Sequence, residues 1–188
     1  MTPPIIEGKK AELDGILQAA ELMLVTARTA PKTGGRDDVL TLLVDGEEKE
    51  AIADEMEETT KEKEIRIYFE RDAKNVRDSE AVVLVGVRGN KSYGLDCGAC
   101  GYDKCSEFEK SQKKLGKYFT GPTCLFKALD LGIALGSAAK MASLLNIDNR
   151  IMVTIGTAAL RLNLLPEATT IIGMPMSAKG KNIYFDRK

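Results

Sequence analysis

All four cysteines of the chain lie between positions 97 and 124, as Cys97, Cys100, Cys105 and Cys124, with the spacing C-x2-C-x4-C-x18-C. Four thiolates form the ligand set of an iron–sulfur cluster or of a structural zinc ion. Two cysteines with two residues between them can turn onto one centre, and the intervening and following glycines suit such a turn because glycine accepts positive φ. The segment therefore predicts a metal centre.

The spacing favours iron–sulfur over zinc without excluding zinc. Zinc ribbons pair one C-x2-C with a second, whereas this chain has one such pair and two single cysteines. The ligand count alone does not separate a two-iron from a four-iron cluster. Zinc therefore stays as the alternative metal.

The ends and the composition of the chain predict a cytoplasmic protein. No basic segment followed by an apolar run opens the sequence, and Lys127, Asp130 and Lys140 interrupt the most apolar stretch, 125–147. Thiols stay reduced in the cytoplasm, which disfavours disulfides. A net charge of −1 and the absence of Trp argue against a nucleic-acid partner, and the absence of His removes histidine-based catalysis. We expect neither a nucleic-acid nor a membrane partner.

The helices and strands that must position the cysteines alternate along the chain, and no clear linker divides them into two domains. Helical patterns are found at 11–28, 47–63, 106–115, 122–145 and 156–164. Strand patterns are found at 39–44, 81–87, 150–155 and 169–173, with a weak alternation over 65–69. The sequence predicts a single α+β domain over 1–188.

Small residues mark one face of the helix predicted over 122–145. Ala128, Gly132 and Gly136 are four residues apart, so they share a face where another backbone can approach closely. We expect a homodimer.

The cysteine segment also resembles a known class of cluster domain. Cys97-Gly-Ala-Cys100-Gly-x3-Cys105 followed by Gly-Pro-x-Cys124 is similar to the 4Fe-4S domain of certain bacterial and archaeal electron-transfer subunits and corrinoid iron–sulfur proteins. The resemblance covers residues 80–141 and implies one 4Fe-4S cluster on the four cysteines. Over its whole length the chain resembles an uncharacterised prokaryotic family of ferredoxin-domain-containing proteins, most visibly at 27–31, 121–124, 130–137 and 180–186.

A second resemblance concerns the scaffold. The loop 27–35, the helix from Asp130 and the stretch 164–175 are similar to the corresponding parts of nitroreductases. This implies a nitroreductase-like domain, with the cysteine segment built in, that binds FMN and forms a homodimer. The arginine-rich N-terminal phosphate anchor of that family has no counterpart before the first helix, where only Lys9 and Lys10 stand.

The nitroreductase resemblance also supplies candidate flavin contacts. They are Arg28, Lys32, Gly34 and Gly35 in the loop, with Lys179 and Lys181 near the phosphate. The alternative is a solvated basic loop and tail.

These observations lead to two hypotheses from different classes. The first is a redox protein with one 4Fe-4S cluster, which exchanges electrons with a partner protein or a small-molecule acceptor. If it is an enzyme, it is a flavin and iron–sulfur oxidoreductase, for which the sequence identifies no catalytic residue. The second is a zinc-stabilised, non-enzymatic binding module.

Overall fold

A four-stranded antiparallel sheet forms the centre of the computed structural model, which describes residues 5–59 and 66–185. The strand order is β1-β2-β6-β5, for β1 (Val39–Val44), β2 (Ala81–Val87), β6 (Thr170–Ser177) and β5 (Asp148–Asn149). The register of the central pair runs from Ala81 opposite Met176 to Val87 opposite Thr170. Every residue of β2 is buried, which explains why this strand reads as an unbroken apolar run.

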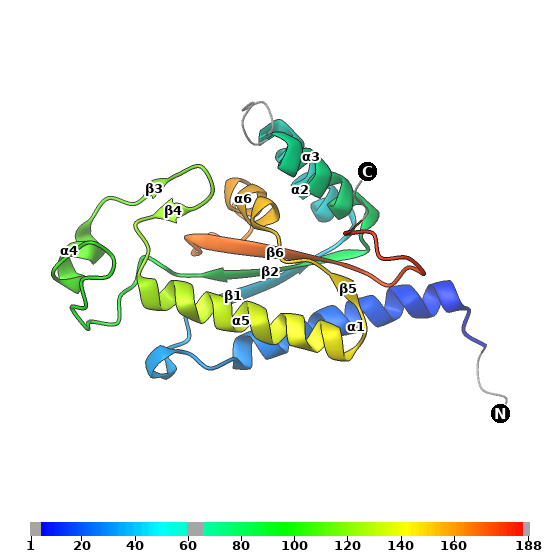
Figure 1. Ribbon diagram of the computed structural model, residues 1–188, viewed down its shortest axis with the longest axis horizontal. Coiled ribbons are helices and arrows are strands. Elements are labelled where there is room, and N and C mark those ends of the chain that lie inside the picture. Colours follow the sequence, from blue (N-terminus) through cyan, green and yellow to red (C-terminus); the bar gives the residue numbers. More distant parts are fainter. Residues whose placement is uncertain (1–4, 60–65, 186–188) are drawn as a thin grey trace.

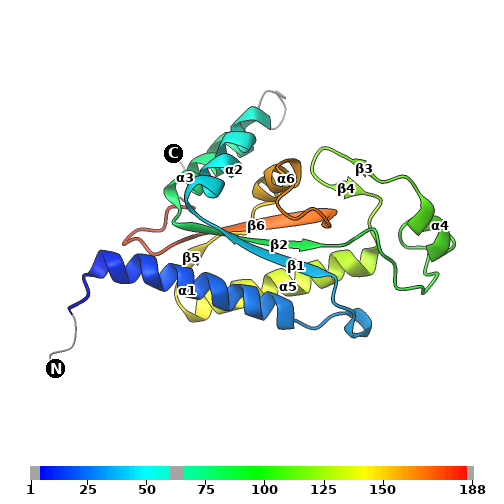
Figure 2. The same cartoon turned by 180° about the vertical axis from the view of Figure 1, so that it is seen from behind.

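Helices cover both faces of the sheet, so the molecule has three layers (Figures 1 and 2). One face carries two long helices that lie side by side, α1 (Gly8–Thr29) and α5 (Leu125–Leu144). The other face carries α2 (Gly46–Thr59), α3 (Arg66–Asp78) and α6 (Val153–Arg161). Within the described residues, no helix combines the length and the apolar character that a membrane span requires.

Alternation along β2 divides the hydrophobic core between the two faces. Val83, Val85 and Val87 pack with α1 and α5, whereas Val82 and Leu84 pack with the three helices opposite. Successive side chains of a strand point to opposite faces, so one central strand serves both cores. The predicted α+β fold class is confirmed.

The cysteine segment projects from one end of the layers, far from the start of α1 (Figure 1). From β2 the chain passes through a loop to α4 (Cys105–Lys110), then through the hairpin β3 (Lys114–Leu115) and β4 (Thr120–Gly121) to α5. The 3-10 turn Thr33–Gly35, which links α1 to β1, lies at the same end.

Two predicted helices near the cysteines have different bounds in the structure. The helix expected over 106–115 ends at Lys110, because Lys114 and Leu115 pair with β4 instead. The helix expected from position 122 begins at Leu125. The backbone of Cys124 is extended, and its N–H donates to the carbonyl of Gly89 at 2.9 Å, a tertiary contact that no local pattern reveals.

Other differences arise where an apolar run fits both a strand and a helix. The strand expected over 150–155 is replaced by a short β5 and by α6, whose Ile155 packs into the core. The last strand continues past 173 to Ser177, and the weak alternation after position 65 belongs to α3. The helix expected over 47–63 is found as α2 to Thr59, and positions 60–65 lie outside the described residues.

Candidate functional site

The four cysteines are spread along the projecting segment. Cys97 and Cys100 lie in the loop after β2, Cys105 is the first residue of α4, and Cys124 caps the start of α5. All four are free thiols. Cys97 is exposed, Cys100 and Cys105 are half-buried, and Cys124 is 6% exposed. The segment therefore presents four reduced sulfur atoms with graded access to water.

Two glycines shape the turn around Cys100. Gly98 and Gly101 have φ of 71° and 86°, in the region that residues with a Cβ rarely adopt. The N–H of Gly101 donates to the carbonyl of Gly98 at 2.9 Å and closes the turn. The positive φ expected at these two positions is confirmed.

Asp96 and Cys105 hold each other through two hydrogen bonds. The backbone N–H of Asp96 donates to Sγ of Cys105 at 3.4 Å, and the N–H of Cys105 donates to Oδ1 of Asp96 at 2.7 Å. Amide donors on ligand sulfurs favour the thiolate form and tune the potential of an iron–sulfur centre. Cys105 thus already has one such donor.

A small aromatic cluster surrounds the buried end of the cysteine segment. Cys124 lies in it with Tyr93 and Phe108, and Cys100 packs against its edge. Aromatic side chains exclude water from the sulfurs, and such shielding controls the redox potential and lability of a metal centre. Cys100 and Cys124 therefore share one shielded environment.

The donor set fits a thiolate-bound centre in its chemistry, although the sulfurs are not gathered around one point. Within the described ranges, which include all four cysteines, no group of three or more His, Cys, Asp or Glu side chains is arranged to hold a metal ion. Cys124 is buried in the aromatic cluster and Cys100 packs against that cluster, whereas Cys97 is exposed. No three of the four sulfurs are grouped, so a centre with four sulfur ligands requires the cysteine segment to rearrange.

A buried polar network lies directly beneath the aromatic cluster. The hydroxyl of Tyr93 donates to Asp130, whose Oδ1 also accepts from the backbone N–H and the hydroxyl of Thr33, at 2.9 and 3.0 Å. Lys127, fully buried, donates to Asp38. Burial, reinforced by the hydrogen bond to Asp130 and its negative charge, raises the pKa of Tyr93 well above its usual range, so this hydroxyl remains a donor. The network ties the cysteine segment to α5 and to the loop before β1.

The predicted flavin contacts in that loop already have partners within the chain. Arg28 donates to the carbonyl of Val39 at 3.1 Å and pairs with Asp37. Lys32 donates to the carbonyl of Ala30 at 3.0 Å and lies 3.8 Å from a carboxylate oxygen of Asp37. Both cations therefore already have partners in the chain, and they share the single carboxylate of Asp37.

The two loop glycines and the two C-terminal lysines lie at opposite ends of the sheet. Gly34 and Gly35 have φ of 58° and 67°, and a Cβ on Gly34 would lie 3.9 Å from the ring of Tyr93. Lys179 and Lys181 follow the far end of β6, where Lys179 lies 3.1 Å from Glu80. The strands between the two ends are about 20 Å long. Within one chain, a single phosphate cannot contact both groups.

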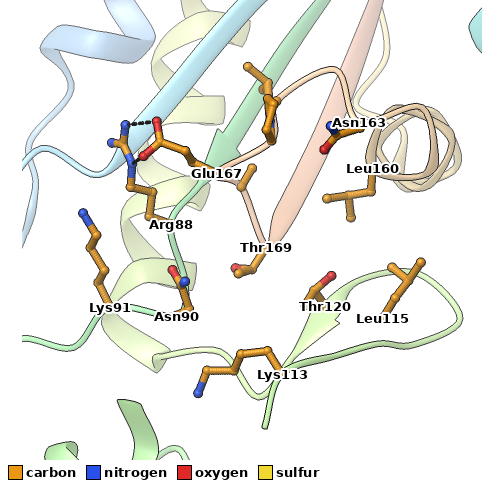
Figure 3. A pocket seen from close by; sticks show the side chains of 13 residues that line it. Arg88, Asn90, Lys91, Lys113, Leu115, Thr120, Leu160, Asn163, Glu167 and Thr169 are labelled. Atoms are coloured by element: carbon orange, nitrogen blue, oxygen red, sulfur yellow. Dashed lines mark hydrogen bonds and ion pairs between the residues drawn. The ribbon is translucent and has the colours of Figure 1, made fainter. Parts of the chain in front are cut away.

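A cavity of about 390 Å³ separates the β3–β4 hairpin from the end of the sheet (Figure 3). Arg88, Lys91 and Lys113 contribute positive charge to its walls, and leucines from the hairpin and from α6 contribute apolar surface. Arg88 forms a two-pronged ion pair with Glu167, at 2.7 and 2.9 Å. Lys113 donates to the carbonyl of Phe108 and to a serine hydroxyl. The cavity therefore combines an excess of positive charge with an apolar wall.

The cavity wall contacts the aromatic cluster around Cys124 through Lys113 and Phe108. The ammonium of Lys113 lies 3.8 Å from the ring centroid of Phe108, which belongs to the cluster around Cys124. On the other side, Gly89 donates to Oγ1 of Thr169 at 2.9 Å and accepts from the N–H of Cys124. A Cβ at Gly89 would lie 2.4 Å from that threonine oxygen, so only glycine allows this close packing.

The cavity residues Arg88, Lys91, Lys113 and Glu167 are not identifiable as a site from the sequence. One signal was present, since Arg88-Gly-Asn-Lys91 directly follows the clearest strand. The partner of Arg88 is 79 residues further along the chain, and no local pattern connects the two. The whole cavity is a product of the tertiary structure.

Comparison with solved structures defines the class of fold. A nitroreductase with bound FMN from Desulfitobacterium hafniense is similar with a TM-score of 0.58 and 14% identity, over 95% of this chain and 81% of that chain. Nitroreductase A from Vibrio parahaemolyticus is similar with a TM-score of 0.53 and 13% identity, over 97% of this chain and 62% of that chain. The fold is nitroreductase-like, and this chain is shorter than both proteins.

Comparison of sequences defines the family. The family model described as "Uncharacterized protein containing a ferredoxin domain" (DUF2148) matches residues 120–187. An uncharacterized protein of Archaeoglobus fulgidus is 46% identical over 185 residues, which is 97% of each chain. The chain belongs to this family of ferredoxin-domain proteins. The family and the fold together indicate a redox function.

Proposed function

We propose that this protein is an iron–sulfur redox protein in which Cys97, Cys100, Cys105 and Cys124 hold one 4Fe-4S cluster. The observation that carries the proposal is the shared, shielded environment of Cys100 and Cys124 beside a basic cavity. Four thiolates complete the ligand set of such a cluster. The amide donor on Cys105 supports the same assignment.

When bound, the cluster supplies one-electron transfer. Residues of the chain determine the access of water to the cluster and the hydrogen bonds to its sulfur ligands. The aromatic cluster keeps water from Cys100 and Cys124, and the backbone of Asp96 donates to the sulfur of Cys105. The exposed side of the segment, at Cys97, leaves room for a redox partner protein to approach.

The cavity is the proposed site of a small-molecule electron acceptor. Its volume of about 390 Å³ lies within the usual range for ligand pockets, and its cations suit an acceptor with an anionic group. FMN is the flavin that the fold suggests, and with it the protein would be a flavin and iron–sulfur oxidoreductase. The candidate flavin contacts Arg28, Lys32, Gly34, Gly35, Lys179 and Lys181 lie outside the wall of this cavity, so a flavin that they hold would be bound beside it.

The metal content of anaerobically purified protein tests the proposed function. We expect about four irons and four sulfides per chain and a broad absorption band near ~400 nm, because a cubane contains four of each. The measurement is iron, zinc and sulfide analysis with an absorption spectrum of the same sample. We propose that the protein is cytoplasmic, so the sample for this measurement should be expressed in the cytoplasm under reducing conditions.

The same sample distinguishes the alternative function. One zinc ion and no sulfide would contradict the cluster and support a zinc-stabilised binding module without redox activity. That protein would be colourless. A chain with neither metal after anaerobic purification would contradict both proposals.

We also propose that the protein is a homodimer formed through the outer face of α5. Leu129 and Ile133 on this face are 51% and 45% exposed, so two large apolar side chains lie one turn apart on the surface of the helix. A Cβ at Gly132 or Gly136 would meet no atom within 4 Å, so these glycines serve no packing within the chain. They leave room for the backbone of a second copy.

Replacement of Ile133 by lysine is expected to convert the dimer to a monomer. The substitution places a charge in the proposed interface, where it loses its hydration. Size-exclusion chromatography with light scattering should give twice 20.5 kDa for the wild type and 20.5 kDa for the variant. Ile151→Lys is the matched control, since Ile151 is 47% exposed and lies outside α5, and it should remain dimeric. A wild type of 20.5 kDa would contradict the dimer.

A further inference from the structure

The most unusual side chain near the cysteines is the buried lysine of α5. Lys127 has no exposed surface and lies in the first turn of α5, three residues after Cys124, which precedes the helix. Removing an ammonium group from water costs several kcal/mol unless nearby groups compensate for it. The groups around Lys127 must therefore compensate for the burial of its charge.

The ring of Tyr93 lies between this lysine and the cysteine cluster. The ammonium of Lys127 is 3.6 Å from the centroid of the Tyr93 ring, and Tyr93 belongs to the buried cluster that contains Cys124. The guanidinium of Arg36 is 5.6 Å from the same centroid. Positive charge therefore lies against the aromatic wall that the cysteines share.

Lys127 has no carboxylate of its own. Asp38 is the carboxylate partner of two lysines, since it pairs with Lys127 and lies 3.8 Å from Lys91. The other buried carboxylate, Asp130, is occupied by Tyr93 and Thr33. Lys127 therefore keeps positive charge against the Tyr93 ring of the cluster that contains Cys124, whose thiol becomes negative when it ligates a metal.

We propose that Lys127 is a positioning residue whose fixed positive charge stabilises the reduced form of the centre held by the four cysteines. This inference rests on the proposed function and deepens it. On reduction one electron passes from the redox partner protein to the centre, the negative charge of the centre rises by one, and no bond of the chain is made or broken. A cation held in a dry environment compensates for that charge far better than an exposed cation does, because water screens the exposed one.

Two lysines that pair with the same carboxylate provide a matched test. Lys127 is fully buried, whereas the side chain of Lys91 is 58% exposed. In the iron-loaded full-length protein, Lys127→Met should shift the midpoint potential, measured by voltammetry, to a more negative value. Lys91→Met should shift it several-fold less. Iron and sulfide content should equal that of the wild type in both variants.

Asp38→Asn keeps the inference testable if Lys127→Met fails to fold. Asparagine has the same shape as aspartate but no charge, so Lys127 loses its counter-charge and the midpoint potential should become more positive. Loaded variants with the potential of the wild type would overturn the inference and leave the proposed function intact. A wild type that takes up no iron would overturn the proposed function, and metal analysis reveals this before any potential is measured.

Discussion

Replacement of Cys97 by serine is expected to lower the iron and sulfide content of the anaerobically purified protein from about four of each to about none. A serine hydroxyl stays protonated at neutral pH and is a poor replacement for a soft thiolate ligand. Cys97 is exposed, so the substitution removes no packing. Without metal, the free energy of unfolding should therefore stay within about 0.5 kcal/mol of that of the wild type.

Replacement of Cys124 by serine should cause the same loss of iron together with a loss of stability. Cys124 is 6% exposed in the aromatic cluster, and a hydroxyl buried there without a partner costs about 1–3 kcal/mol. Denaturant unfolding of the metal-free proteins measures this difference between the two variants. Ser106→Ala, an exposed substitution next to Cys105, is the control and should keep its iron. Retention of four irons by Cys97→Ser would show that Cys97 is not a ligand.

Replacement of Gly156 by alanine is expected to destabilise the fold by about 3 kcal/mol or more. A Cβ at this position of α6 would lie 1.7 Å from the carbonyl oxygen of Ile171 and 2.4 Å from its carbon. Both are backbone atoms of β6 and cannot rotate away, so α6 would have to leave the sheet. Denaturant unfolding followed by circular dichroism measures the change in the free energy of unfolding.

Gly15→Ala is the matched control for this prediction. Gly15 lies within α1, and a Cβ there would meet no atom within 4 Å. Alanine is favoured over glycine in the interior of a helix by about 1 kcal/mol, so this variant should be more stable than the wild type. The same chemical change should thus have opposite signs at the two positions. Equal unfolding midpoints for Gly156→Ala and the wild type would contradict the packing of α6 on β6.

The inference about Lys127 bears on how the cavity and the cysteine centre would work together. Lys91 lines the cavity and shares Asp38 with Lys127, which lies against the wall of the cysteine cluster. Asp38 therefore connects the charges of the two sites. An anionic acceptor in the cavity would compete with Asp38 for Lys91, and the charge left on Asp38 would act on Lys127.

The sequence alone was sufficient for features that depend on neighbours along the chain. The strands at 39–44 and 81–87 have the predicted bounds, because short apolar runs between turn-forming residues leave few other conformations. The first helix is found where its apolar period predicts it. The positive φ of Gly98 and Gly101 also follows from residue type and spacing. The family of ferredoxin-domain proteins was recognised from the same local motifs.

Only the tertiary structure decided the features that join distant segments. Apolar residues 151–155 suit a strand or a helix equally, and the close approach of Gly156 to β6 selects the helix. The ion pair of Lys127 joins residues 89 apart, and that of Arg88 joins residues 79 apart. The sequence therefore indicated which residues are able to bind a metal. The packing of the chain determined which charges and which cavity lie beside them, because electrostatic and packing interactions act through space and are independent of separation along the chain.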